Sequence, residues 1–123
     1  MKSKPSILIV EDDIALNEAY VIILKTLYEN VYTAFNGEEA LHVAELQKPD
    51  IIFLDLRMPV MDGLGFLEKY QPKDLHPDVH IVVFSNYDMQ PEVDKAYELG
   101  AERYVLKALA SPKELLKIVS SLS

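Results

Sequence analysis

The chain has 123 residues, half of them hydrophobic, and a formal net charge of −8. This length suits one domain with a sizeable core. The absence of cysteine excludes a disulfide framework and a cysteine-built metal site. Phosphate backbones repel an acidic chain that has no Lys/Arg cluster, so direct nucleic-acid binding is not expected. No apolar stretch approaches the ~18 residues of a membrane span, and the first residues do not form a signal peptide, so we expect a cytoplasmic protein.

Short apolar runs alternate with longer amphipathic segments along the chain. The runs are rich in Ile, Val and aromatic residues, which is typical of strands. Three are almost continuously apolar, as in a parallel sheet buried on both faces, and the more mixed second run suits an edge. The predicted strands are Ile7–Val10, Val31–Phe35, Ile51–Leu54, Ile81–Phe84 and Tyr104–Leu106.

The segments between these runs have helical spacing of apolar residues. In the first helix, the predicted buried face runs from Leu16 through Tyr20 to Leu27. Ser111 and Glu114 form a capping-box pattern that starts the last helix. Five βα units predict a single doubly wound, five-stranded parallel sheet with five helices on both faces. The predicted helices are Asp13–Glu29, Gly37–Gln47, a third around Leu64–Tyr70, Gln90–Leu99 and one after Ser111, with residues 71–77 as a loop.

Polar residues follow four of the predicted strands at the point where each strand ends. Glu11 and Asp12 follow the first strand, and Asp55 follows the third. Ser85 follows the fourth strand, and Lys107 follows the fifth. The carboxyl ends of parallel strands line one edge of the sheet, where ligands bind. We therefore expect these five side chains to converge.

The chemistry of this set indicates phosphoryl transfer. Three carboxylates repel one another unless a cation neutralises them, and Mg²⁺ prefers such oxygen ligands. A carboxylate such as Asp55 can attack phosphorus, while Lys107 and Ser85 can supply charge and a donor to the phosphoryl oxygens. An acid after a strand can instead simply cap the next helix, as we expect for Asp13. The joint pattern at four strand ends favours the functional interpretation.

Four segments resemble a known family, the receiver domains of two-component response regulators. The most specific is Asp55–Gly63, with the sequence DLRMPVMDG, which resembles the phosphoacceptor loop of that family. Ile7–Asp13, Val82–Asn86 and Gly100–Lys107 are similar to its first, fourth and fifth strands and the residues that follow. The resemblance covers essentially residues 1–123 as one domain. It implies a flavodoxin-like fold of the chemotaxis-regulator type, with strand order 2-1-3-4-5.

The resemblance also implies a metal site and an acceptor. Asp55 would be the phosphoacceptor. Asp12 and Asp55 would contact Mg²⁺ directly, and Glu11 would act largely through water. The backbone carbonyl of Arg57 would complete the protein ligands.

Further roles are implied for residues around the phosphoryl group. Ser85 would bond the phosphoryl group and Lys107 would pair with it. Tyr104 would be the switch aromatic that changes rotamer with Ser85. Arg57 and Tyr87 stand two residues beyond site residues, at positions that tune the lifetime of the phosphoryl group.

The function implied is a signalling switch. A histidine kinase or a histidine phosphotransfer protein would donate the phosphoryl group to Asp55. The surface of the fourth helix, fifth strand and fifth helix would then change its affinity for an output domain or target protein. Such a protein catalyses only its own phosphorylation and slow hydrolysis, so it is not a turnover enzyme. The sequence is compatible with a stand-alone regulator and with a piece of a larger protein.

One departure and three alternatives qualify the resemblance. The family usually has a cis proline after the lysine, but here Ala108 follows, so the Lys107–Ala108 peptide is either strained or trans. A Mg²⁺ phosphohydrolase would need a second acid where Arg57 stands. In a flavin carrier, Glu11 and Asp12 would repel the cofactor phosphate. A receiver-like protein that only binds partners would not need the intact acidic set.

Overall fold

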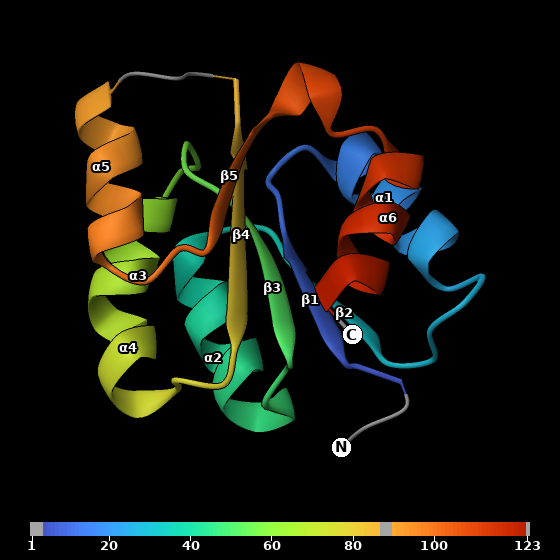
Figure 1. Ribbon diagram of the computed structural model, residues 1–123, viewed down its shortest axis with the longest axis horizontal. Helices are drawn as coiled ribbons and strands as arrows, with labels where there is room; N and C mark the ends of the chain where they lie inside the picture. The colour runs from blue at the N-terminus through green and yellow to red at the C-terminus, as the bar shows by residue number, and fades with distance from the viewer. Residues whose placement is uncertain (1–3, 87–89, 123) are drawn as a thin grey trace.

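The computed structural model describes residues 4–86 and 90–122 and contains a parallel sheet between two helical layers (Figure 1). The strand order is β2-β1-β3-β4-β5, as predicted, and the mixed second strand lies at an edge. The strands are β1 (Ile7–Val10), β2 (Val31–Ala34), β3 (Ile51–Asp55), β4 (His80–Ser85) and β5 (Arg103–Leu106).

Helices cover both faces of the sheet. Figure 1 shows α1 (Ile14–Leu24) and α6 (Pro112–Leu122) on one face, with α2 (Gly37–Gln47), α3 (Gly63–Tyr70) and α5 (Gln90–Glu98) on the other. Successive strand residues point to opposite faces, so Ile7 and Ile9 pack under α1 and α6 while Leu8 and Val10 join the other core cluster. Among the helices in the described ranges, none has both the length and the apolar character that a membrane crossing requires.

The first helix is shorter than predicted. It ends at Leu24 because, beyond the Lys25 amide that still bonds to Val21, the Thr26 and Leu27 amides bond to carbonyls only three residues back. This tighter turn carries Leu27 outward, where 58% of it is exposed, so its assignment to the buried face was wrong. The residues of α1 that are buried are Asn17, Tyr20 and Leu24.

The segment predicted as a loop contains one extra turn of helix, α4 (Pro72–Leu75). Pro72 stands at its first position, where a fixed φ and a missing N–H cost nothing. The ring of Tyr70, before this turn, stacks on the ring of His76, after it, with centroids 4.1 Å apart.

The two predicted helix caps are confirmed. The Leu16 amide donates to Asp13 Oδ1 at 3.0 Å at the start of α1. The Glu114 amide donates to Ser111 Oγ at 3.2 Å at the start of α6. These caps fix where the chain leaves the sheet after β1 and before α6.

The strand register places the site. Val10 of β1 pairs with Leu54 of β3, so the residues that follow them, Glu11 and Asp55, lie at one level, with Asp55 as the last residue of β3. Further across, Asp55 pairs with Phe84, and Ser85 pairs with Leu106. Four strand ends therefore meet along one edge, at the top of the sheet in Figure 1.

Candidate functional site

Three carboxylates meet at the carboxyl edge of the sheet. Glu11, Asp12 and Asp55 each offer one oxygen atom, and these atoms lie within 4.8 Å of one another. Glu11 is 0% exposed and Asp55 is 2% exposed, whereas Asp12 faces solvent. The structure therefore brings together the acidic set that the sequence indicated.

Lys107 reaches into this cluster from the end of β5. Its Nζ donates a hydrogen bond to Asp55 Oδ2 at 2.9 Å and lies 2.6 Å from Glu11 Oε1 in an ion pair. The lysine side chain is only 12% exposed. One ammonium thus faces two buried carboxylates, and the cluster of three acids keeps an excess of negative charge.

Burial and charge shift the acidities of these groups. Burial, with some help from the Asp55 charge, raises the pKa of Glu11 to about 7, although Lys107 and the Asp13 amide act to lower it. Burial also raises the pKa of Asp55, against the opposing effect of Lys107. Burial alone would lower the pKa of Lys107, but its contacts with Glu11 and Asp55 raise it above its ordinary value. Since burial disfavours the ionised forms of Glu11 and Asp55, a cation bound beside them would stabilise those forms.

Asn17 of α1 holds the backbone at Glu11 in place, a role that was not predicted from the sequence. Its Nδ2 donates to the carbonyl oxygens of Glu11 at 3.0 Å and of Ala34 at 3.3 Å. The Asp13 amide donates to Glu11 Oε2 at 3.0 Å. The feature of the sequence that could have indicated this role is the position of Asn17, about one turn before Tyr20 and on the buried side of α1.

The acceptor loop, residues 56–62, is fixed by bonds at both ends. The Arg57 amide faces Asp55 Oδ1 at 3.4 Å, and the Gly63 amide donates to the Leu56 carbonyl at 2.9 Å. A Cβ at Gly63 would lie 2.5 Å from the Asp55 carbonyl oxygen, so only glycine fits there. Asp62 caps α3 by accepting from the Gly65 amide at 2.8 Å.

The site opens to solvent through a cavity of about 320 Å³. It is lined by every predicted metal-site and phosphoryl-contact residue, together with Asp13, which was predicted only as a helix cap, and Asn86, which was not assigned a role. Ser85 is fully buried at the end of β4, and Tyr104 is half-buried against the core under α3 and α5. Tyr87 lies outside the described residues. The lining residues are Glu11, Asp12, Asp13, Asp55, Arg57, Ser85, Asn86 and Lys107.

A family model described as response regulator receiver domain matches residues 7–120. The chain belongs to this family. Receiver domains are signalling domains of two-component systems that interact with kinases and output domains, and they are not classical enzymes. The resemblance identified from the sequence is therefore confirmed.

Known proteins similar to this receiver domain include regulators and isolated receivers. The chain is 33% identical over 120 residues to the probable transcriptional regulator ycf27 of Cyanophora paradoxa, covering 98% of this chain and 48% of that protein. It is 44% identical over 84 residues to the nitrate/nitrite response regulator protein NarL of Escherichia coli, covering 68% of this chain and 38% of that protein. A CheY-like receiver domain protein from Methanospirillum hungatei has a TM-score of 0.87 at 29% identity, covering 98% and 94%. The chain spans less than half the length of these two regulators.

Arg57 ties the acceptor loop of the receiver domain to α5. Its guanidinium forms an ion pair with Glu92, and the two side chains are 50% and 27% exposed. Arg57 also lines the acidic cavity. It therefore lies between the acceptor and α5, a helix of the surface that the signalling hypothesis expects to change its affinity for a partner. The role of Glu92 was not predicted from the sequence.

The lysine loop, residues 107–111, departs from the form usual in the family. The Lys107–Ala108 peptide is trans, which resolves the alternative left open by the sequence. Lys107–Leu109 form a short 3-10 helix, η1, closed by the Ala110 amide donating to the Lys107 carbonyl at 3.0 Å. The lysine reaches Asp55 from this turn without a cis bond.

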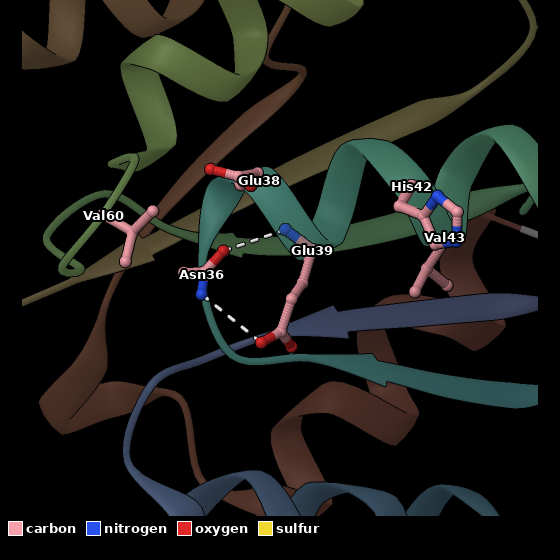
Figure 2. Close-up of a pocket in the computed structure, with 6 residues that line it drawn as sticks. All are labelled: Asn36, Glu38, Glu39, His42, Val43 and Val60. Carbon is pink, nitrogen blue, oxygen red and sulfur yellow. Dashed lines mark hydrogen bonds between the residues drawn. The ribbon is translucent and has the colours of Figure 1, made fainter.

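A larger hollow, of about 590 Å³, lies at the start of α2 (Figure 2). Figure 2 shows Asn36 and Glu39 bonded to each other: the Glu39 amide donates to Asn36 Oδ1 at 2.9 Å, and Asn36 Nδ2 donates to Glu39 Oε2 at 3.4 Å. These groups cap the helix. Size alone does not mark the functional site, and we place that site at the acid cluster.

Proposed function

We propose that this receiver domain takes a phosphoryl group onto Asp55 in a Mg²⁺-dependent reaction. The observation that carries the proposal is the placement of Asp55. Its carboxylate is buried at the edge of the sheet, lies in the acid cluster, and accepts a hydrogen bond from Lys107. A purely structural acid would not need a buried lysine and two further carboxylates beside it.

The acid cluster fits Mg²⁺ by its donor chemistry. Mg²⁺ prefers oxygen ligands at about 2.0–2.1 Å and keeps several waters. Three carboxylate oxygens within 4.8 Å suit such an ion, with Asp12 and Asp55 as direct ligands and Glu11 acting mainly through water. Glu11 Oε1 is buried and meets the Lys107 ammonium at 2.6 Å, so the single positive charge of that lysine is shared between Glu11 and Asp55. The Arg57 carbonyl would complete the ligands. Mg²⁺ when bound would neutralise charge on the phosphoryl oxygens and the acids.

The chain's own residues would carry the transfer. A carboxylate oxygen of Asp55 attacks the phosphorus of the donor, the new O–P bond forms, and the bond from phosphorus to the donor's leaving atom breaks with its electron pair going to that atom. Lys107 and the Ser85 hydroxyl hold the phosphoryl oxygens. Hydrolysis later returns the free carboxylate and inorganic phosphate, so no separate substrate is turned over.

The consequence of phosphorylation would be a change in the face formed by α5, β5 and α6. Ser85 at the end of β4 would draw toward the phosphoryl group, and Tyr104 of β5 would change rotamer into the space that Ser85 leaves. Tyr104 is half-buried against the core, so its side chain lies between the core and solvent. We propose a histidine kinase or histidine phosphotransfer protein as donor, and an output domain or target protein as the partner of this face.

Intact-mass measurement tests the proposal. The wild-type protein is incubated with Mg²⁺ and acetyl phosphate, beside Asp55→Asn and the matched control Asp78→Asn, which changes an exposed acid before β4. The wild type and Asp78→Asn gain one phosphoryl mass, and chelation of Mg²⁺ abolishes the gain. A wild type that gains no mass, or an Asp55→Asn protein that gains as much, contradicts the proposal.

A further inference from the structure

The lysine loop has few restraints of its own. Ala108 and Leu109 are exposed, Leu109 to 68%, so neither anchors the turn in the core. Ala110 is the buried member at 2% exposure, and its amide closes η1 on the Lys107 carbonyl. A turn of this kind needs an outside contact to keep its orientation.

That contact comes from Tyr20 of α1, 90 residues earlier in the chain. The Tyr20 hydroxyl donates a hydrogen bond to the Ala110 carbonyl at 2.9 Å, and the tyrosine is 0% exposed. Burial raises the pKa of Tyr20 to about 12, so its hydroxyl stays a donor at neutral pH. The bond fixes the far end of the turn that carries Lys107.

The Tyr20 ring supports Lys107 by a second route. It packs edge-on against Phe84, with centroids 5.4 Å apart and planes at 83°. The Lys107 Nζ lies over the Phe84 ring, 5.8 Å from its centroid and within range of a cation–π interaction. Phe84 directly precedes Ser85. Tyr20 thus braces both the loop that carries the lysine and the ring under its ammonium.

We propose that Tyr20 is a positioning residue that holds the Lys107 ammonium at Asp55 by fixing the Ala110 end of the lysine loop. This inference rests on the proposed function in one respect, the role of Lys107 in phosphoryl transfer. Because the trans Lys107–Ala108 peptide contains no proline, the turn lacks the rigidity of a proline ring. The hydrogen bond from Tyr20 restrains the turn from another element of the fold. Tyr20 does not touch the reacting atoms.

The test compares Tyr20→Phe, which removes only the hydroxyl, with Tyr70→Phe as matched control. Tyr70 is equally a buried tyrosine but packs on Phe66 in the other core cluster, away from the lysine loop. The first readout is acetic-anhydride labelling of Lys107, normalised to exposed Lys95 and measured by mass spectrometry on the folded proteins. The second is the rate of phosphorylation by acetyl phosphate at saturating Mg²⁺.

Tyr20→Phe should raise Lys107 labelling roughly 2- to 10-fold, which matches the loss of one hydrogen bond that limits local opening. It should slow phosphorylation roughly 10-fold through misplacement of the ammonium. Tyr70→Phe should change neither readout. Lower global stability would also raise labelling of buried Lys107 relative to exposed Lys95, so the free energy of unfolding of both variants is measured by urea denaturation beside the labelling.

If Lys107 in Tyr20→Phe is labelled only to the same extent as in the wild type, the proposal is overturned, whatever the phosphorylation rate. Raised labelling with an unchanged rate also overturns it, because the lysine would then move without consequence. If the wild type itself takes no phosphoryl group, the proposed function fails separately, and labelling alone decides whether Tyr20 holds the lysine.

Discussion

The two loops that bring chemistry to the site are held in different ways. The acceptor loop is fixed largely by bonds among residues close in sequence: Gly63 bonds to Leu56, and Asp62 caps the helix that follows. Two longer-range contacts add to these, the Gly37 amide on the Met61 carbonyl at 2.8 Å and the Arg57–Glu92 ion pair. The lysine loop is held at Ala110 by a hydroxyl from α1, 90 residues away. The first loop carries most of its own geometry, whereas the second depends more on a contact from a distant element of the fold. The comparison suggests that changes in the acceptor loop act locally and that distant changes reach the site through Lys107.

Removal of the lysine itself should give the largest effect. Lys107→Ala leaves Asp55 and Glu11 buried without their shared ammonium and removes charge from the phosphoryl oxygens. We expect phosphorylation by acetyl phosphate to slow about 100-fold or more, as for loss of one charged or polar donor at a reacting group. Lys113→Ala, which removes an exposed lysine from α6, is the control. An equal rate in Lys107→Ala would mean that the lysine loop is not part of the chemistry.

The local restraint of the acceptor loop can be broken by one methyl group. In Gly63→Ala the new Cβ would meet backbone atoms, the Asp55 carbonyl oxygen at 2.5 Å and the Leu56 Cα at 2.8 Å. We expect a loss of about 2–3 kcal/mol in the free energy of unfolding, measured by urea denaturation. Ala108→Gly in the exposed part of the lysine loop should cost less than about 1 kcal/mol. Equal losses in the two variants would remove the distinction between the loops.

The charge balance in the acid cluster, which the two loops flank, predicts a pH dependence. Without divalent cation, the pKa of Glu11 is about 7 in the folded protein against its ordinary value of 4.5. The folded state therefore holds a proton that the unfolded state has released between these values, so the free energy of unfolding falls as pH rises from about 4.5 to about 7. The upward shift of Asp55 acts in the same direction. The shift in Lys107 acts only near and above its ordinary value of 10.5.

We expect this fall to reach about 1–3 kcal/mol in urea denaturation with a chelator, and to shrink when Mg²⁺ is added. Glu11→Gln should flatten the slope. Stability that rises with pH over this range in the chelated wild type would show that Glu11 is not protonated within the fold.

The smallest effect is expected for the tie between the acceptor loop and α5. Arg57→Ala removes an exposed ion pair to Glu92, so stability should change by no more than about 1 kcal/mol. The positive charge near the phosphoryl group should slow its loss, so the variant should lose phosphate roughly 2- to 5-fold faster. Glu92→Gln, which leaves the guanidinium in place, should not shorten the lifetime. An unchanged decay rate in Arg57→Ala would exclude Arg57 from tuning.

The contrast between local contacts and contacts from distant elements also explains which features the sequence could predict. The parallel sheet followed from alternating runs, and its strand order was implied by the family resemblance. The meeting of Glu11, Asp55, Ser85 and Lys107 followed from their positions at strand ends. The caps at Asp13 and Ser111 were likewise local signals. All of these depend on residues near one another in the chain or on a regular register.

The contacts that the sequence did not reveal depend on how elements pack. The end of α1 at Leu24 is set by a tightened turn, which hydrophobic spacing does not report. Glu92 and Tyr20 looked like ordinary helix residues, because their partners, Arg57 and the Ala110 carbonyl, lie in other segments. The form of the lysine loop stayed open for the same reason: nothing near Ala108 in the sequence substitutes for the missing proline.

Direct identification of the phosphorylated residue tests the central claim most sharply. The wild-type protein is treated with acetyl phosphate and Mg²⁺, the acyl phosphate is reduced with borohydride, and peptides are mapped by mass spectrometry. The account predicts homoserine at position 55 in treated protein and aspartate there when Mg²⁺ is chelated. Homoserine at position 12 or 13 in place of position 55, or at no position, would contradict the assignment of Asp55 as the acceptor.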